Sequence, residues 1–166
     1  MTNEKIGREL IITRIFDAPP ERVWKAWTDP AEAKKWWGPK DFTAPTVKID
    51  FRVGGKYLNC MRGVAAPGEP VRDFWSTGTY KEIEPMKKIV LTDSFADEHG
   101  NVVSAEHYGM KGLPMELQVT VTFEETRDGN TKMTLRHVGL SEGTIQEMTD
   151  TGWNQSFDKL AASITN

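Results

Sequence analysis

The end of the chain, residues 142–164, carries the pattern that most restricts the possible folds, which is one long amphipathic helix. At about 100° of turn per residue, its large apolar side chains share one broad face. These residues are Ile145, Met148, Trp153, Phe157, Leu160 and Ile164. The middle of this face is narrow because it holds Thr149, Gly152 and Ser156. A glycine inside a helix costs about 1 kcal/mol relative to alanine, so Gly152 calls for a structural or functional reason.

Two explanations are open for the narrow strip at Gly152. Small side chains let a strand or a second helix pack closely against this helix. Alternatively, they leave space for a cavity between the helix and the element that covers it. The periodicity of the helix alone favours close packing.

Ahead of this helix the pattern changes to period two, which is typical of strands with one buried face. The clearest case is residues 115–125, where four large apolar residues alternate with polar ones. In all, strands are predicted over residues 9–17, 46–52, 56–62, 74–83, 88–95, 115–125 and 131–138. Residues 96–114 show no clear periodicity and are predicted to form a loop.

Two short helices are predicted after the first strand. Pro20 and Pro30 each suit the first turn of a helix, and Asp29 can cap the second one. The sequence Trp36-Trp37-Gly38-Pro39 ends it. One-sided strands form an antiparallel sheet, and only the final helix is long enough to cover its buried face. We therefore expect a single α+β domain over residues 1–166, in which a curved antiparallel sheet of about six to seven strands wraps around the C-terminal helix.

The composition excludes several functional classes. The net charge is -3 and the sequence pI is about 5.7, so no basic surface is expected and nucleic acid is not a predicted partner. The single Cys60 rules out an intrachain disulfide and a multi-cysteine metal site, and His99 and His107 form no helical ligand pair. No metal and no cofactor are therefore predicted. No apolar run approaches about 18 residues and residues 1–8 are polar, so we expect no membrane association and a cytoplasmic location.

Four stretches of the chain, taken together, resemble one known family. They are Phe16-Asp17-Ala18-Pro19 leading to Val23–Pro30, then Trp36-Trp37-Gly38-Pro39, then Asp50–Gly55, and finally Gly152-Trp153 leading to Phe157–Leu160. In this order they resemble the activator of Hsp90 ATPase homologue 1-like family, which is part of the START-like (SRPBCC) superfamily. The resemblance implies the helix-grip fold and a hydrophobic cavity between the sheet and the long helix. It makes a cavity at Gly152 about as expected as close packing.

With that cavity in view, eight residues are predicted to contact a ligand: Trp37, Trp75, His137, Met148, Thr149, Gly152, Trp153 and Ser156. The four tryptophans of the short helices either pack in the core or, for Trp36 or Trp37 beside the Gly-Pro stop, edge the mouth of the cavity. Trp75 and Trp153 are the better candidates for its interior. His137 is in phase with the apolar residues of its predicted strand and should point inward. It is either a hydrogen-bonded core residue or a group that orients a ligand or moves a proton. No catalytic residue is assigned.

Three functions are compatible with these observations. The leading hypothesis is a stand-alone START-like domain that binds a small, largely apolar molecule in a cavity of roughly 300–1,000 Å³. The second is a protein-interaction module of the Hsp90-activator type, with a chaperone or another protein as partner and a role in stress response. It requires an exposed apolar patch. The third, and less expected, is a cyclase- or hydrolase-like enzyme that uses the same cavity, with His137 and Asp93 or Tyr108 as polar groups.

Overall fold

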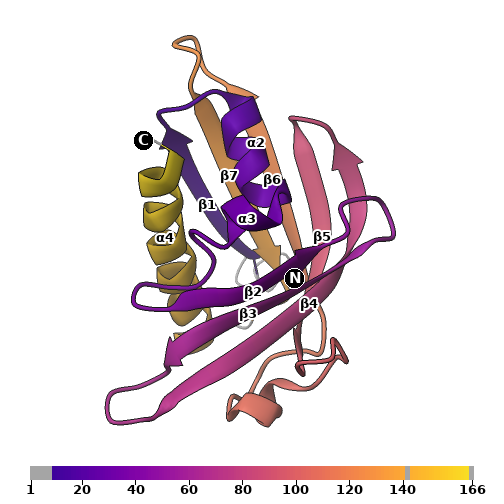
Figure 1. Ribbon diagram of the computed structural model, residues 1–166, viewed down its shortest axis with the longest axis vertical. Helices are drawn as coiled ribbons and strands as arrows, with labels where there is room; N and C mark the ends of the chain where they lie inside the picture. Colours follow the sequence, from indigo (N-terminus) through magenta and orange to yellow (C-terminus); the bar gives the residue numbers. More distant parts are fainter. Residues whose placement is uncertain (1–8, 141–142, 165–166) are drawn as a thin grey trace.

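The structure is a computed structural model that describes residues 9–140 and 143–164 (Figure 1). These residues form a seven-stranded antiparallel sheet in the order β1-β7-β6-β5-β4-β3-β2. Its strands are β1 (Glu9–Phe16), β2 (Thr43–Ile49), β3 (Lys56–Val64), β4 (Val71–Glu84), β5 (Lys88–Ala96), β6 (Leu117–Glu125) and β7 (Thr131–Val138). The helices are α2 (Pro20–Thr28), α3 (Pro30–Ala33) and α4 (Thr144–Ile164), and a 3-10 turn, η1, spans Ala105–Tyr108. The predicted helix-grip α+β fold is confirmed.

The sheet is strongly curved, and the helices lie on its concave side (Figure 1). The long helix α4 runs beside β1 and also contacts α2, while α2 lies against β6 and α3 against β2. The sheet therefore closes around the helices from two sides, as the one-sided strand pattern requires. Within the described residues, no helix combines the length and the apolar character that crossing a membrane requires.

Two differences from the predicted element boundaries have a structural reason. The second short helix is only four residues long, because it is followed at once by turns that carry Trp36 and Trp37. Its predicted cap is confirmed, since the Asp29 side chain accepts a hydrogen bond of 2.9 Å from the Ala31 N–H. Strand β2 begins at Thr43 and contains a register shift, so the period-two rule placed its start too late. The predicted start of the long helix, residue 142, lies outside the described residues.

The apolar core fills the space between the concave face of the sheet and the helices. Helix α2 buries one face, which consists of Val23, Trp24, Ala26 and Trp27. Two buried indoles find polar partners there: the Trp27 N–H points at the sulfur of Met133 (3.2 Å), and the Trp36 N–H donates to the Ala26 carbonyl (2.9 Å). Trp27 and Trp36 are thus fixed elements of the core.

A close approach between β4 and its neighbours depends on Gly78. A methyl group at this position would lie 1.8 Å from the carbonyl oxygen of Thr92 and 2.7 Å from the ring of Tyr57. Because glycine has no side chain, the Tyr57 ring crosses β4 at this point and its hydroxyl reaches β5, where it donates to the Thr92 carbonyl at 3.1 Å. Gly78 therefore determines where the Tyr57 hydroxyl lies.

We expect Gly78→Ala to lower the free energy of unfolding by about 3 kcal/mol or more, because the added methyl overlaps backbone atoms that cannot move aside. Urea unfolding followed by circular dichroism measures the change. Gly152→Ala is the matched control, since no described atom outside the backbone of its own helix and its chain neighbours lies within 4 Å of its added methyl. Helix propensity predicts a gain of up to about 1 kcal/mol for this variant. Similar losses for both variants would contradict the close approach at Gly78.

Candidate functional site

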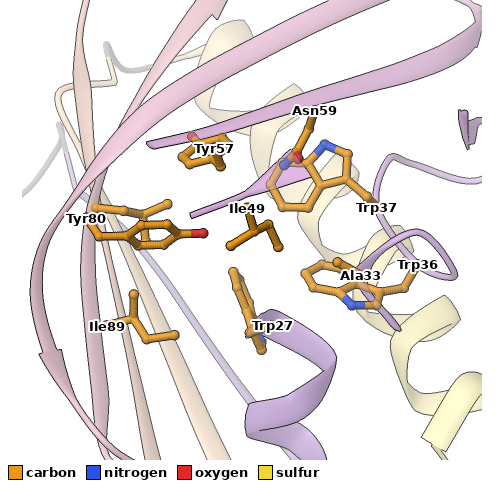
Figure 2. Close-up of a pocket in the computed structure, with 10 residues that line it drawn as sticks. Trp27, Ala33, Trp36, Trp37, Ile49, Tyr57, Asn59, Tyr80 and Ile89 are labelled. Atoms are coloured by element: carbon orange, nitrogen blue, oxygen red, sulfur yellow. The ribbon is translucent and has the colours of Figure 1, made fainter. Parts of the chain in front are cut away.

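A small cavity lies between the short helices α2 and α3 and strands β2 to β5 (Figure 2). Its volume of about 20 Å³ suffices for one water molecule. This is far below the roughly 300–1,000 Å³ expected from the sequence, because aromatic side chains fill most of the space. The cavity is lined by Trp27, Ala33, Trp36, Trp37, Ile49, Tyr57, Asn59, Tyr80, Ile89 and Leu91.

Two polar groups interrupt this mostly apolar lining. Asn59 is 4% exposed, and its Oδ1 accepts no hydrogen bond from any described residue. Figure 2 shows the Tyr80 hydroxyl pointing toward the middle of the lining side chains. Burial raises the pKa of Tyr80, so its hydroxyl stays protonated near neutral pH. The cavity thus offers one unpaired acceptor and one hydroxyl to anything that enters it.

Trp37 lies at the edge of the cavity and is partly exposed, whereas Trp36 is fully buried. The segment that follows Trp37 is attached to α4 by three hydrogen bonds. The Lys159 ammonium donates to the backbone carbonyls of Pro39 (3.2 Å) and Phe42 (3.0 Å), and the side chain of Gln155 accepts from the N–H of residue 40 (3.1 Å). Burial lowers the pKa of Lys159. The long helix therefore positions the edge of the cavity.

A second polar cluster lies next to the cavity and reaches it through Tyr57. The Trp153 indole N–H donates to Nδ1 of His137 (3.0 Å), so neutral His137 carries its proton on Nε2. His137 Nε2 accepts or donates no hydrogen bond among the described residues, and it lies 3.6 Å from Oδ2 of Asp93. The other oxygen of Asp93 accepts from the Tyr57 hydroxyl (3.1 Å). Tyr57, whose ring lines the cavity, thus links the two sites.

The protonation states of this cluster follow from burial. His137 is 3% exposed, and desolvation lowers its pKa more than the nearby Asp93 raises it. Desolvation, together with the Asp93 charge, holds the pKa of Tyr57 well above its usual value. Both residues are therefore neutral donors at neutral pH, and both face the Asp93 carboxyl group.

Residues 17–165 match the sequence profile of the family described as "Activator of Hsp90 ATPase homolog 1-like protein". This chain belongs to that family. No curated protein matches the chain.

Several solved bacterial structures are similar to this family member over nearly their whole length. Protein CV1439 from Chromobacterium violaceum is 28% identical, with 96% of this chain and 98% of that one covered and a TM-score of 0.75. Protein Ms6760 from Mycobacterium smegmatis is 28% identical, with 96% and 90% covered and a TM-score of 0.73. A protein from Arthrobacter aurescens is also 28% identical, with 96% and 87% covered and a TM-score of 0.74. None of these names states a ligand or an activity.

The eight predicted ligand contacts do not lie in one environment. Trp37 lines the cavity, while Trp153 and His137 form the adjoining polar cluster. Trp75 is half-buried on β4, where its backbone N–H donates to the hydroxyl of Tyr108 (3.2 Å). Met148 is 59% exposed, so the apolar face of α4 does not extend inward at that position.

The narrow strip of α4 does not serve as a packing contact at Gly152. Apart from its chain neighbours and the backbone of its own helix, no described atom lies within 4 Å of a methyl group built there, so the close-packing explanation is wrong for this residue. Thr149 and Ser156 use their hydroxyls within the helix, donating to the carbonyls of Ile145 (2.8 Å) and Gly152 (2.9 Å). That Thr149, Gly152 and Ser156 contact a ligand stays a prediction.

The lining residues that the sequence analysis missed include Asn59 and Tyr80. Asn59 had a recognisable signal, because it occupies an inward position of β3 in phase with buried Tyr57. A polar residue on the buried face of a strand usually has a specific hydrogen-bond partner, so its presence there indicates a functional or structural contact. Ala33 and Ile49 had none, since they come from separate elements that only the folded chain brings together.

We expect the free energy of unfolding to fall as the pH is lowered from about 6.5, by about 1.4 kcal/mol per pH unit until the lowered pKa of folded His137 is reached. The unfolded chain takes up a proton at the usual histidine pKa of about 6.5, and the folded chain does not. The unfolded state then binds more protons, so stability rises with pH in this window. Urea unfolding at pH 7.5 and pH 5.5 measures the difference.

His137→Gln is expected to lose most of this pH dependence, whereas His99→Gln, at an exposed position, keeps it. Hydrogen bonds to basic side chains lower the pKa values of Glu32 and Asp73. These two groups therefore change the stability only below about pH 4.5, outside the range that is measured. An unchanged pH dependence in His137→Gln would show that His137 is not buried as a neutral group.

Proposed function

We propose that this protein binds a small, largely apolar molecule that carries one hydrogen-bond donor, in a widened form of the cavity between α2–α3 and strands β2 to β5. The observation that carries the proposal is Oδ1 of Asn59, a buried acceptor without a partner among the described residues. Leaving such a group unpaired costs about 1–3 kcal/mol. A ligand N–H or O–H directed at Asn59 would recover this cost, while the aromatic walls favour an apolar body.

Binding requires the cavity to widen, because about 20 Å³ admits only a water-sized group. Trp37 is the side chain whose movement would achieve this. It lies at the edge, it is partly exposed, and its ring meets Trp153 edge-on with centroids 5.9 Å apart. The backbone beyond Trp37 stays fixed by Lys159 and Gln155, so a rotation of one indole would open a path without unfolding the segment.

Indole is a suitable probe, because it is apolar and has one N–H donor. We expect wild-type protein to bind indole in isothermal titration calorimetry, and Ala33→Val to weaken that binding at least about tenfold by filling the cavity. Ala31→Val is the matched control: it adds the same β-branched residue to the same short helix at an exposed position. Thermal unfolding of both variants verifies that they remain folded.

Equal loss in both alanine variants would place the effect in helix α3 and not in the cavity. Absence of indole binding by the wild-type protein, together with no molecule detected by native mass spectrometry of protein purified from its own host, would end the proposal.

A second candidate, binding of a protein partner such as Hsp90, is favoured by two exposed side chains on the edge strand β1. Ile11 and Ile15 are 51% and 67% exposed and lie on the same face of the strand. They would give a partner a small apolar contact.

Ile11→Thr combined with Ile15→Thr should weaken a pull-down with Hsp90 several-fold, because it removes this apolar contact, and should leave indole binding unchanged. Thr13→Ser, on the same strand, is the control. No retention of the wild-type protein by Hsp90 at tens of micromolar would exclude this candidate.

A further inference from the structure

The polar cluster behind Tyr57 contains a gap between a donor and an acceptor. Nε2 of His137 and Oδ2 of Asp93 are 3.6 Å apart, which is too long for a direct hydrogen bond. An oxygen atom can lie about 2.8 Å from both only beside the line that joins them, where it accepts from Nε2 and donates to Oδ2 through bent hydrogen bonds. Nε2 of His137 is buried and unpaired, while the side chain of Asp93 is 25% exposed. The pair therefore meets solvent at Asp93, and one of the two side chains has to move slightly to admit an oxygen atom beside Nε2.

Both ends of the gap have fixed roles. Trp153 occupies Nδ1 of His137 with its own N–H, which forces the neutral imidazole to donate from Nε2. The Tyr57 hydroxyl shares its one proton between the Thr92 carbonyl and Oδ1 of Asp93, and Oδ2 is left as an acceptor. The group that fits must therefore accept from His137 and donate to Asp93.

Few chemical groups do both with one atom. An ammonium or amide nitrogen donates but cannot accept, and a carbonyl or ether oxygen accepts but cannot donate. A carboxylate accepts from His137 and repels Asp93. A hydroxyl oxygen accepts and donates at once, so it satisfies both partners.

We propose that Asp93 and His137 form a hydroxyl-binding subsite, oriented by Trp153 and Tyr57, which selects apolar molecules that bear an alcohol or phenol group. The subsite deepens the proposed function and rests on it, because Tyr57 joins the subsite to the cavity and Trp153 packs against two lining residues, Trp27 and Trp37. Asn59 then pairs with a second polar group of the same molecule.

Two probes that differ in a single group test the subsite: 2-naphthol and 2-methylnaphthalene, in which a methyl group replaces the hydroxyl. By calorimetry at pH 8, where His137 is neutral, wild-type protein is expected to bind 2-naphthol at least about tenfold more tightly, since one of the two bonds is to a charged carboxylate. Asp93→Asn should abolish the preference, because an amide nitrogen facing His137 gives the hydroxyl two donors and no acceptor.

Asp158→Asn is the matched control, since it removes an exposed carboxylate from α4. A preference that survives Asp93→Asn and disappears in Asn59→Leu would place the hydroxyl at Asn59 and overturn the inference. Equal affinities of wild-type protein for the two probes would mean that no ligand hydroxyl binds between Asp93 and His137, and this result would overturn the inference as well. Because indole does not need the subsite, retention of indole binding separates this failure from a failure of the proposed function.

A spectroscopic readout distinguishes direct contact from a structural effect. In long-range proton–nitrogen correlation spectra, 2-naphthol should shift the Nε2–H signal of His137 and leave the unprotonated Nδ1 signal in place. His137→Gln identifies the signal. An Nε2 resonance unmoved at saturating 2-naphthol would contradict the proposed contact.

Discussion

The aromatic contacts of Trp27 hold the parts of this molecule in place. Its ring packs against Trp36 (4.8 Å between centroids), Trp153 (6.1 Å) and Phe157 (6.2 Å). These partners come from the segment after α3 and from α4, so one side chain of α2 joins three separate segments on the concave face. Since aromatic pairs add to the free energy of simple burial, this contact explains why four-residue α3 keeps a defined position.

The same aromatic shell governs the chemistry of the polar groups inside it. Rings around His137 and Tyr57 exclude water, and exclusion of water disfavours their charged forms. The carboxyl group of Asp93 is the exception because its side chain remains partly exposed. The result is an interior that offers neutral donors around a single acidic group, which suits an uncharged ligand better than an ionic one.

Sequence reasoning recovered the fold because periodicity and element order depend on local properties. The inward orientation of His137 also followed from strand phase, and the position of Trp37 at an edge followed from the Gly-Pro stop after it. The location and size of the cavity did not follow, since they depend on how the sheet curves. Register shifts in β2 and β4 set that curvature, and the bulge between Tyr80 and Glu82 has no sequence signature.

The remaining errors concern α4, where the helical pattern predicts which residues share a face but does not predict how deeply each of them is buried. Met148 is in phase with the buried residues and is nevertheless exposed, because burial on α4 increases toward Phe157 and Leu160 in its second half. Gly152 is in phase too, and no described atom from a covering element lies within 4 Å of a methyl group built there. Periodicity assumes that the covering element follows the whole helix, and here the cover is partial.

The way Lys159 holds the segment beside Trp37 has an evolutionary consequence. Its ammonium binds the backbone carbonyls of Pro39 and Phe42, and every amino acid supplies such a carbonyl. Substitutions at those two positions can therefore alter the shape and polarity of the entrance while the anchor is retained. Related proteins that keep a lysine at the position of Lys159 can therefore vary at positions 39 and 42 and differ in the ligands that they prefer.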